Sequence, residues 1–319
     1  MKITCNNTYK ADEEILNENV FEKYGYCSPS SEREIICLAA SGNKAAQKSY
    51  ADLLFYRKIP CRGNYGKAFP LYLEAAGISF GENGIECTGD GTPLAFYVIG
   101  YYLVNYKCES ILKKCETIDV IEKLTRQERL SLAMDLAIAT LRSCKSPAAV
   151  NLIGRIIKEC PSLADKLDEN ASADDYFEDA AENGYVYACN NLAAKEADLI
   201  VKGEGDVSFH VNEFVHYLTI SADRYEPYAA NRLGLFYMTG EIRSSSGDKV
   251  FLHDQINIPF AKKYFQKATV YPDVNSAWAY FNLIKYFHKD YDTNIELLNE
   301  HMDCIKELNP AVYDLAIEL

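Results

Sequence analysis

Apolar residues recur at helical spacing along most of the chain, in pairs of segments separated by short breaks. The pattern is clearest over residues 209–240, where Phe214 and Leu218 lie on one predicted helix and Leu233 lies on the next. Pro227 stands at the break, where a proline begins a helix without losing a backbone hydrogen bond. A lone helical hairpin cannot bury such a face, so we expect packed neighbours on both sides.

The predicted pairs align on their second helices. In each, a small residue is followed four positions later by a large one, and then usually by Gly or Ala. The small anchors are Ala46, Ala95, Ala149, Ala188, Ala229, Ala277 and Ala311. Their spacing runs from 34 residues (Ala277 to Ala311) to 54 residues (Ala95 to Ala149). Such a period, lengthened by inserts, is typical of an array of helical hairpins.

The first helices of the pairs share a second pattern. Two positions seven residues apart lie about two turns apart, on one stripe that a neighbouring helix can approach. These pairs are Ala68 and Ala75, Ala173 and Ala180, Phe214 and Ser221, and Ala261 and Ala268. Cap signals agree with this phase, because three predicted N-cap side chains each precede a proline. They are Thr92-Pro93, Ser146-Pro147 and Asn309-Pro310.

These patterns predict an all-α fold of about seven helical hairpins. We expect an N-terminal cap or arm over residues 1–29 and one continuous repeat array over residues 30–319. Two Gly- and Ser-rich inserts, 81–91 and 243–248, are predicted as loops between helices, the second of them flexible. The first lacks the ending of a phosphate-binding loop and the register of a calcium-binding loop. We expect no strand-period segment of any length.

The paired alanines, the turn glycine and the following A-x-x-x-L-G-x-x-Y resemble the Sel-one-like repeat, a relative of the tetratricopeptide repeat. The segments that carry the resemblance are DAAENGYVYACNNLA, SADRYEPYAANRLGLFYMTG and EAAGISF with LAFYVIGYYL. It covers about residues 30–319, and Asn282 departs from it where a small residue is expected. The resemblance implies a right-handed α-solenoid whose first helices line a concave surface, usually serving as an adaptor for protein or peptide partners.

Composition narrows the classes of partner. With 33 Lys and Arg against 46 Asp and Glu, the formal net charge is −13, which disfavours nucleic acid and anionic membranes as partners. Eleven cysteines without a CxxC pair predict neither a disulfide framework nor a zinc ribbon; most are expected to be buried thiols. No signal peptide and no apolar run of 18 residues is present, so we predict a cytoplasmic protein.

The chain shows no pattern of residues typical of catalysis. Its five histidines include no pair three or four residues apart that would place two metal ligands on one helix face. Neither a nucleophile elbow nor a metalloprotease motif is present. We therefore predict no catalytic residue, no metal site, no cofactor and no enzymatic activity.

The remaining candidate site is the concave surface that the resemblance implies. On each first helix, the second and fifth positions after the first small residue lie together, away from the packed stripe. The predicted partner contacts are Asp175, Glu178, His216, Thr219, Lys263 and Gln266. Along the array they change from acidic through neutral to basic, as expected of a graded groove for a peptide.

These features predict a non-catalytic protein–protein interaction scaffold or adaptor that binds a peptide or protein segment on its concave surface. The alternative is a regulatory sensor solenoid that binds a small molecule or a signalling peptide. The short last helix, YDLAIEL, is expected to leave an apolar end exposed, which would invite an end-to-end homodimer.

Overall fold

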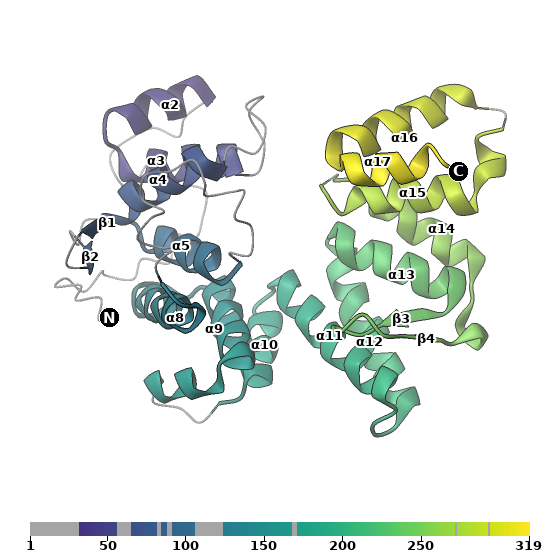
Figure 1. Cartoon of the computed structure of the whole chain (residues 1–319), viewed down its shortest axis with the longest axis horizontal. Helices are drawn as coiled ribbons and strands as arrows, with labels where there is room; N and C mark the ends of the chain where they lie inside the picture. The colour runs from purple at the N-terminus through teal and green to yellow at the C-terminus, as the bar shows by residue number, and fades with distance from the viewer. Residues whose placement is uncertain are drawn as a thin grey trace. The chain divides into compact units, whose positions relative to one another are not determined.

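The computed structural model describes most of the chain and divides it into two compact units. The described residues are 32–55, 65–81, 84–87, 91–105, 124–167, 171–271, 273–292 and 294–319. Unit 1 comprises Met1–Ala180 and unit 2 comprises Ala181–Leu319. In both units the described residues are mainly helical, with one short β-hairpin in each (Figure 1).

Unit 1 is built from helices in which each packs on the next along the chain. They are α2 (Glu32–Ala40), α3 (Lys44–Phe55), α4 (Tyr65–Ala76), α5 (Pro93–Asn105), α8 (Arg126–Ser143), α9 (Pro147–Glu159) and the greater part of α10 (Ala173–Glu182). A 3-10 segment, Pro161–Lys166, follows α9. The hairpin β1 (Ile78–Gly81) and β2 (Gly84–Cys87) lies between α4 and α5.

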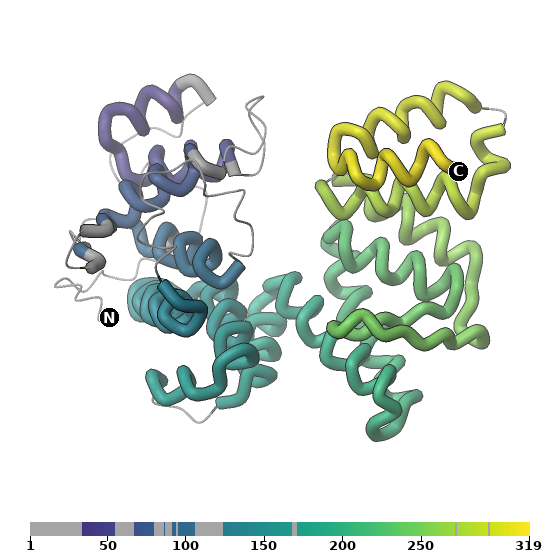
Figure 2. Tube along the Cα trace, viewed as in Figure 1, coloured from purple at the N-terminus to yellow at the C-terminus, as the bar shows by residue number. Residues whose placement is uncertain are grey.

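Unit 2 repeats this plan, and the tube in Figure 2 follows its consecutive helical turns. Its helices are α11 (Val186–Lys202), α12 (Val207–Asp223), α13 (Pro227–Thr239), α14 (Ile258–Lys267), α15 (Ser276–Tyr286), α16 (Ile295–Leu308) and α17 (Pro310–Ala316). Two 3-10 segments, His253–Gln255 and His288–Asp290, join them. The hairpin β3 (Glu241–Arg243) and β4 (Lys249–Phe251) lies between α13 and α14.

The predicted all-α class built of helical hairpins is confirmed by this order of helices. Two short antiparallel strand pairs, β1–β2 and β3–β4, were not predicted. Strands of three or four residues are too short to show a period of two in the sequence. The predicted cap, 1–29, lies outside the described residues. Helix α10 crosses the boundary between the units. The expectation of one continuous array over residues 30–319 stays a prediction.

Small residues on the second helices allow aromatic rings to pack between repeats. A Cβ atom built on Gly234 of α13 would lie 2.4 Å from the ring of Phe265 in α14. A Cβ atom on Gly154 of α9 would lie 2.8 Å from the ring of Phe177 in α10. Both rings are fully buried. The two contacts are equivalent in the repeat, so these glycines serve the stacking of one helix on the next.

The three predicted N-cap residues each stand directly before a helix that begins with proline. Ser146 caps α9, where its hydroxyl oxygen accepts the Ala149 backbone N–H at 3.2 Å. Asn309 occupies the N-cap position of α17 but makes no side-chain cap bond, so that part of the prediction was wrong. Pro227 does begin α13, as its position in the sequence indicates.

Glu226 caps α13 from a buried position. Its Oε2 accepts the Ala229 N–H at 2.7 Å and the Asn190 side-chain amide at 3.0 Å, while Oε1 accepts the Tyr228 N–H at 3.3 Å. Burial raises the pKa of this carboxyl group, although these hydrogen bonds oppose the shift. The side chain thus ties the start of α13 to α11.

Replacing Glu226 with Ala should lower the free energy of unfolding of unit 2 by about 1–3 kcal/mol. Two backbone N–H groups and the Asn190 amide would lose their acceptor. Urea unfolding at neutral pH measures the loss. Glu226→Gln keeps an acceptor oxygen and should recover part of it; an Ala variant as stable as the parent would show that the cap contributes nothing.

Candidate functional site

A groove of about 580 Å³ lies on unit 2. Helix α13 contributes Tyr228, Asn231, Arg232 and Leu235, and α15 contributes Trp278, Phe281, Asn282, Lys285 and Tyr286. The β3–β4 hairpin adds Glu241, Arg243, Ser244, Ser245, Gly247 and Lys249, and α11 adds Ala194. Second helices and a hairpin therefore line this groove, whereas the resemblance implied a surface lined by first helices.

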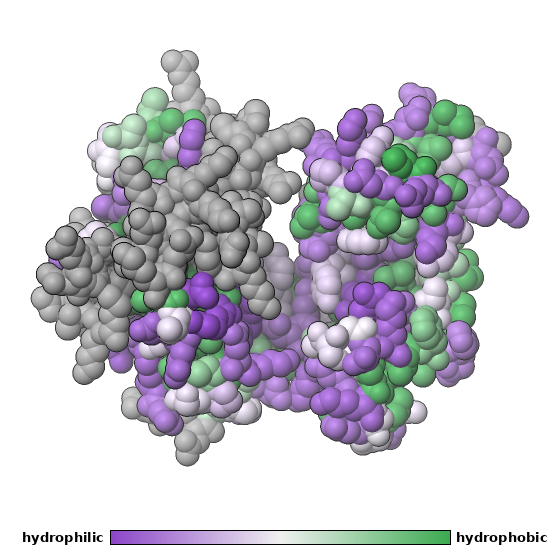
Figure 3. All heavy atoms as spheres, viewed as in Figure 1, coloured by the Kyte–Doolittle hydropathy of each residue, from purple (hydrophilic) through white to green (hydrophobic). Residues whose placement is uncertain are grey.

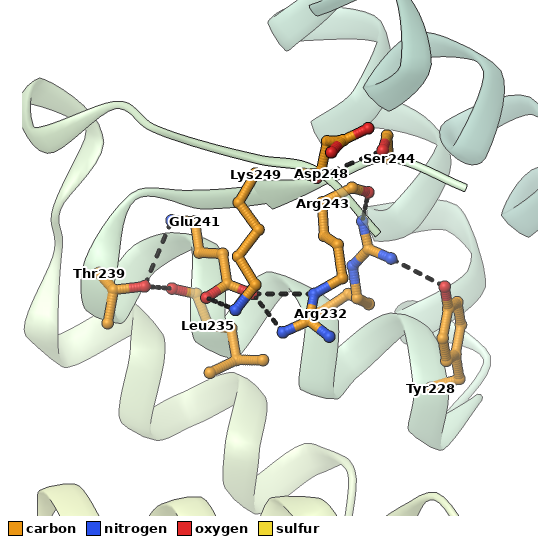
Figure 4. Close-up of polar contacts among 9 residues, drawn as sticks. All are labelled: Tyr228, Arg232, Leu235, Thr239, Glu241, Arg243, Ser244, Asp248 and Lys249. Atoms are coloured by element: carbon orange, nitrogen blue, oxygen red, sulfur yellow. Dashed lines mark hydrogen bonds and ion pairs between the residues drawn. The ribbon is translucent and has the colours of Figure 1, made fainter. Parts of the chain in front are cut away.

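The hairpin carries a cluster of charged side chains beside α13 (Figure 4). Glu241 accepts a hydrogen bond from Arg243 Nη2 at 3.0 Å through Oε1, and its Oε2 lies 3.3 Å from Lys249 Nζ. Arg232 Nη2 donates to the Arg243 carbonyl oxygen at 3.0 Å, and Arg232 Nη1 donates to the Tyr228 hydroxyl at 2.9 Å. These bonds fix the hairpin and its charges against the helix.

The turn of the hairpin is held by its serines. Ser244 N–H donates to the Asp248 carbonyl oxygen at 2.9 Å, and the Ser246 hydroxyl donates to Asp248 Oδ2 at 2.7 Å. Ser245 N–H donates to Asp198 Oδ1 on α11 at 2.6 Å. The segment 243–248, predicted as a flexible loop, is the turn of a β-hairpin that bonds to α11 and α13. Its anchor lies 47 residues away in sequence, where local patterns give no signal.

One face of α15 is aromatic and cationic. Trp278, the only tryptophan of the chain, is 41% exposed and packs edge-on against Phe281, with ring centroids 5.8 Å apart. The Lys285 ammonium lies 5.8 Å from the Phe281 ring centroid and 5.2 Å from that of Tyr286. Positions 278, 281 and 285 share one helix face. This spacing was visible in the sequence, but our prediction considered first helices only.

The contacts of Asn282 explain why this position departs from the repeat. Its side chain is buried, and its Nδ2 donates to Asn231 Oδ1 at 3.0 Å. The two amides thus join α13 to α15 in the lining of the groove. A small residue at position 282 would remove this link, so the exception in the sequence coincides with the groove.

The six predicted contacts lie on first helices, and none of them lines this groove. Five are exposed and Thr219 is half-buried. Asp175 also has a local role, since its Oδ2 accepts the Ser172 N–H at 2.7 Å and the Ser172 hydroxyl at 2.8 Å at the start of α10. Those in unit 1 are Asp175 and Glu178, and those in unit 2 are His216, Thr219, Lys263 and Gln266. Their role in binding stays a prediction.

A buried polar cluster near the C-terminal helices is the strongest candidate for chemistry outside the groove. The Tyr291 hydroxyl lies 2.9 Å from His301 Nδ1, and the ring of Tyr280 lies 4.7 Å from that of His301. Burial raises the pKa of both tyrosines to about 12 and lowers that of His301. Such shifts favour the neutral forms, which suits core packing. Among the described residues, no three His, Cys, Asp or Glu side chains gather as a metal site.

His301 should make unit 2 less stable in mild acid. Burial lowers its pKa in the folded state, whereas the unfolded chain takes up a proton near the ordinary value of about 6.5. The free energy of unfolding should therefore fall as the pH drops through about 6.5 toward the folded-state pKa. Urea unfolding followed at pH 7.5 and 5.5 measures the fall. It should be smaller in His301→Gln; equal falls in both proteins would rule out this histidine as the cause.

The described cysteines are more exposed than expected. Cys144 and Cys189 are buried, and burial raises the pKa of both thiols. Cys160 and Cys304 are half-buried and Cys37 is exposed. The prediction that most cysteines are buried was thus wrong for the described part of the chain. These five are free thiols.

Apolar side chains also reach the surface of unit 2 outside the groove, as the green patches in Figure 3 show. At the start of α14, Ile258 and Phe260 are exposed. In and after α17, Leu315, Ile317 and Leu319 are exposed. The exposed apolar end agrees with the expectation from the sequence, while the homodimer stays a prediction. In the part of the chain described, no helix combines the length and the apolar character needed to cross a membrane.

Comparison with known proteins finds solved structures that are similar to this chain. No family model matches the chain, and no curated protein matches it. A Sel1 repeat protein from Oxalobacter formigenes is 15% identical with a TM-score of 0.44, covering 89% of this chain and 100% of that one. A protective antigen of uropathogenic Escherichia coli strains, displaying an SLR fold, is 15% identical with a TM-score of 0.33, covering 90% of this chain and 58% of that one.

Proposed function

We propose that the protein is a non-catalytic interaction scaffold that binds a peptide, or an extended segment of a partner protein, in the groove of unit 2. The observation that carries this proposal is the groove itself, in which the only tryptophan of the chain stands partly exposed beside Phe281. Aromatic and arginine side chains are the residues that most often dominate binding energy at protein interfaces.

The form of the groove favours a segment over an enclosed small molecule. Trp278, Arg243, Lys249 and Lys285 are all exposed, so the lining opens to solvent along the hairpin and α15. A rigid surface made of stacked helices binds an extended partner without ordering its own backbone. The polar contacts of the hairpin with α13 and α11 hold its backbone in place before binding.

Selection from a random peptide display library against the full chain tests this function. We expect enrichment of peptides that bind the parent protein and are lost from Trp278→Ala. A selection that enriches no such peptide would overturn the proposal. Circular dichroism of the variant controls for folding, and Trp278 is exposed enough for its replacement to leave the core intact.

A further inference from the structure

The charge of the groove is opposite to that of the chain. Its lining carries four cationic side chains, Arg232, Arg243, Lys249 and Lys285, against the single carboxylate of Glu241. The chain as a whole has a formal net charge of −13. A positive groove on an acidic protein attracts anionic groups locally and repels them elsewhere.

Two of these cations have no carboxylate partner within the described residues. Arg232 donates to the Tyr228 hydroxyl and the Arg243 carbonyl oxygen, both neutral acceptors. Lys285 lies over the rings of Phe281 and Tyr286. A guanidinium group has five N–H donors, so Arg232 retains donors for a ligand. Both side chains are therefore available to an anionic ligand.

The other two cations share one carboxylate. Arg243 and Lys249 both contact Glu241, whose side chain is only 15% exposed (Figure 4). One carboxylate balances one of the two charges, so the rim keeps an excess of positive charge. Two further carboxylates of this region, Asp198 and Asp248, accept from Ser245 and Ser246 in the turn and keep their charge, but neither lines the groove.

The rest of the lining fits a polypeptide. The exposed Trp278 and the half-buried Phe281 offer an aromatic surface for a large apolar side chain. The bond between Asn282 and Asn231 uses Asn282 Nδ2 and Asn231 Oδ1, so the Asn231 Nδ2 and Asn282 Oδ1 atoms remain for other hydrogen bonds in the lining. Such a pair matches the C=O and N–H groups of one peptide unit.

We propose that the groove of unit 2 recognises an acidic peptide segment that also carries an aromatic or large aliphatic side chain. This inference rests on the proposed function and assigns the chemistry of its ligand. Carboxylates of the segment pair with Arg232 and Lys285 and with the hairpin cations, while its apolar side chain packs on Trp278. A long nucleic acid is disfavoured, because its phosphates would extend from the groove over a chain of net negative charge.

The test uses the full chain and three synthetic peptides of about ten residues, measured by calorimetry. All three share one Phe and one Leu; their other positions are Asp and Glu, the uncharged Asn and Gln, or Lys. We expect the acidic peptide to bind at least about tenfold more tightly than the amide peptide, and the basic peptide most weakly. The preference should shrink as salt rises from about 50 to 300 mM. Equal affinities for acidic and amide peptides would overturn the inference.

Substitutions in the groove test whether its charged side chains cause the preference for the acidic peptide. Lys285→Gln, at an exposed position, should weaken binding of the acidic peptide about threefold to tenfold and leave the amide peptide unchanged. Glu241→Gln should strengthen binding of the acidic peptide, because it frees Arg243 and Lys249. Lys306→Gln on α16 is the matched control, since Lys306 is exposed, lies over the Tyr313 ring as Lys285 lies over that of Tyr286, and does not line the groove. Acidic-peptide affinity that Lys285→Gln and Glu241→Gln leave unchanged would contradict the assignment.

The experiments distinguish failure of this inference from failure of the proposed function. Displayed peptides that need Trp278 but show no acidic preference would leave the scaffold standing and refute the acidic ligand. Absence of any peptide that needs Trp278 would refute both. A single-stranded oligonucleotide that displaces the acidic peptide at an equal concentration would reassign the groove to nucleic acid and refute the inference.

Discussion

Phe265→Ala should lower the free energy of unfolding of unit 2 by about 3–5 kcal/mol, the usual cost of emptying a buried phenylalanine site. The ring is fully buried, lies against Gly234 of the preceding helix and stacks 6.4 Å from Tyr286. Its loss would open a cavity between α13, α14 and α15. Urea unfolding followed by Trp278 emission reports on unit 2, since this tryptophan is the only one in the chain.

The effect of Gly234→Ala on the free energy of unfolding should depend on whether the Phe265 ring is present. In the parent protein the new Cβ atom would lie 2.4 Å from Phe265, and we expect a loss of about 1–3 kcal/mol. In the Phe265→Ala background the clash is gone, and the better helix propensity of Ala should make the change neutral or favourable by up to about 1 kcal/mol. Equal losses in both backgrounds would show that the glycine and the ring are not coupled.

Trp278→Ala should abolish measurable binding of a groove peptide, or weaken it by about 2 kcal/mol or more, roughly thirtyfold. A partly exposed aromatic side chain in the lining offers the largest apolar surface for a ligand to cover. Calorimetry with a peptide from the display selection measures the loss, since the variant no longer carries the fluorophore.

Phe209→Ala is the matched control for this substitution. Phe209 lies on α12 in the same unit, is exposed, and does not line the groove. We expect the control to bind as the parent does. If both variants lose affinity alike, the loss reflects a general effect of removing surface aromatics and the groove is not the site.

Most of the fold was predictable because each repeat carries its own signals. The alanine anchors, the glycine that follows in several repeats and the proline at the helix start are local features, and they placed helices such as α12 and α13 where the structure has them. The pairing of Gly234 with Phe265 was not predicted, although the repeat relates it to the pairing of Gly154 with Phe177.

The groove was not predictable, because its parts come together only in three dimensions. Arg232, Arg243 and Lys285 lie on three separate elements, α13, β3 and α15. The hairpin that supplies Arg243 is too short to recognise from its sequence. Two signals were present and were misread. Asn282 departs from the repeat because its side chain bonds to Asn231. The spacing of Trp278, Phe281 and Lys285 places them on one face of a second helix.

The emission of Trp278 during titration with a groove peptide tests the central claim most directly, because the only tryptophan of the chain lies in the proposed site. We predict a saturable change in emission whose dissociation constant equals the one from calorimetry, in the parent protein and in Phe209→Ala. A peptide that binds by calorimetry while the emission of Trp278 stays constant would place the binding site elsewhere and contradict the account.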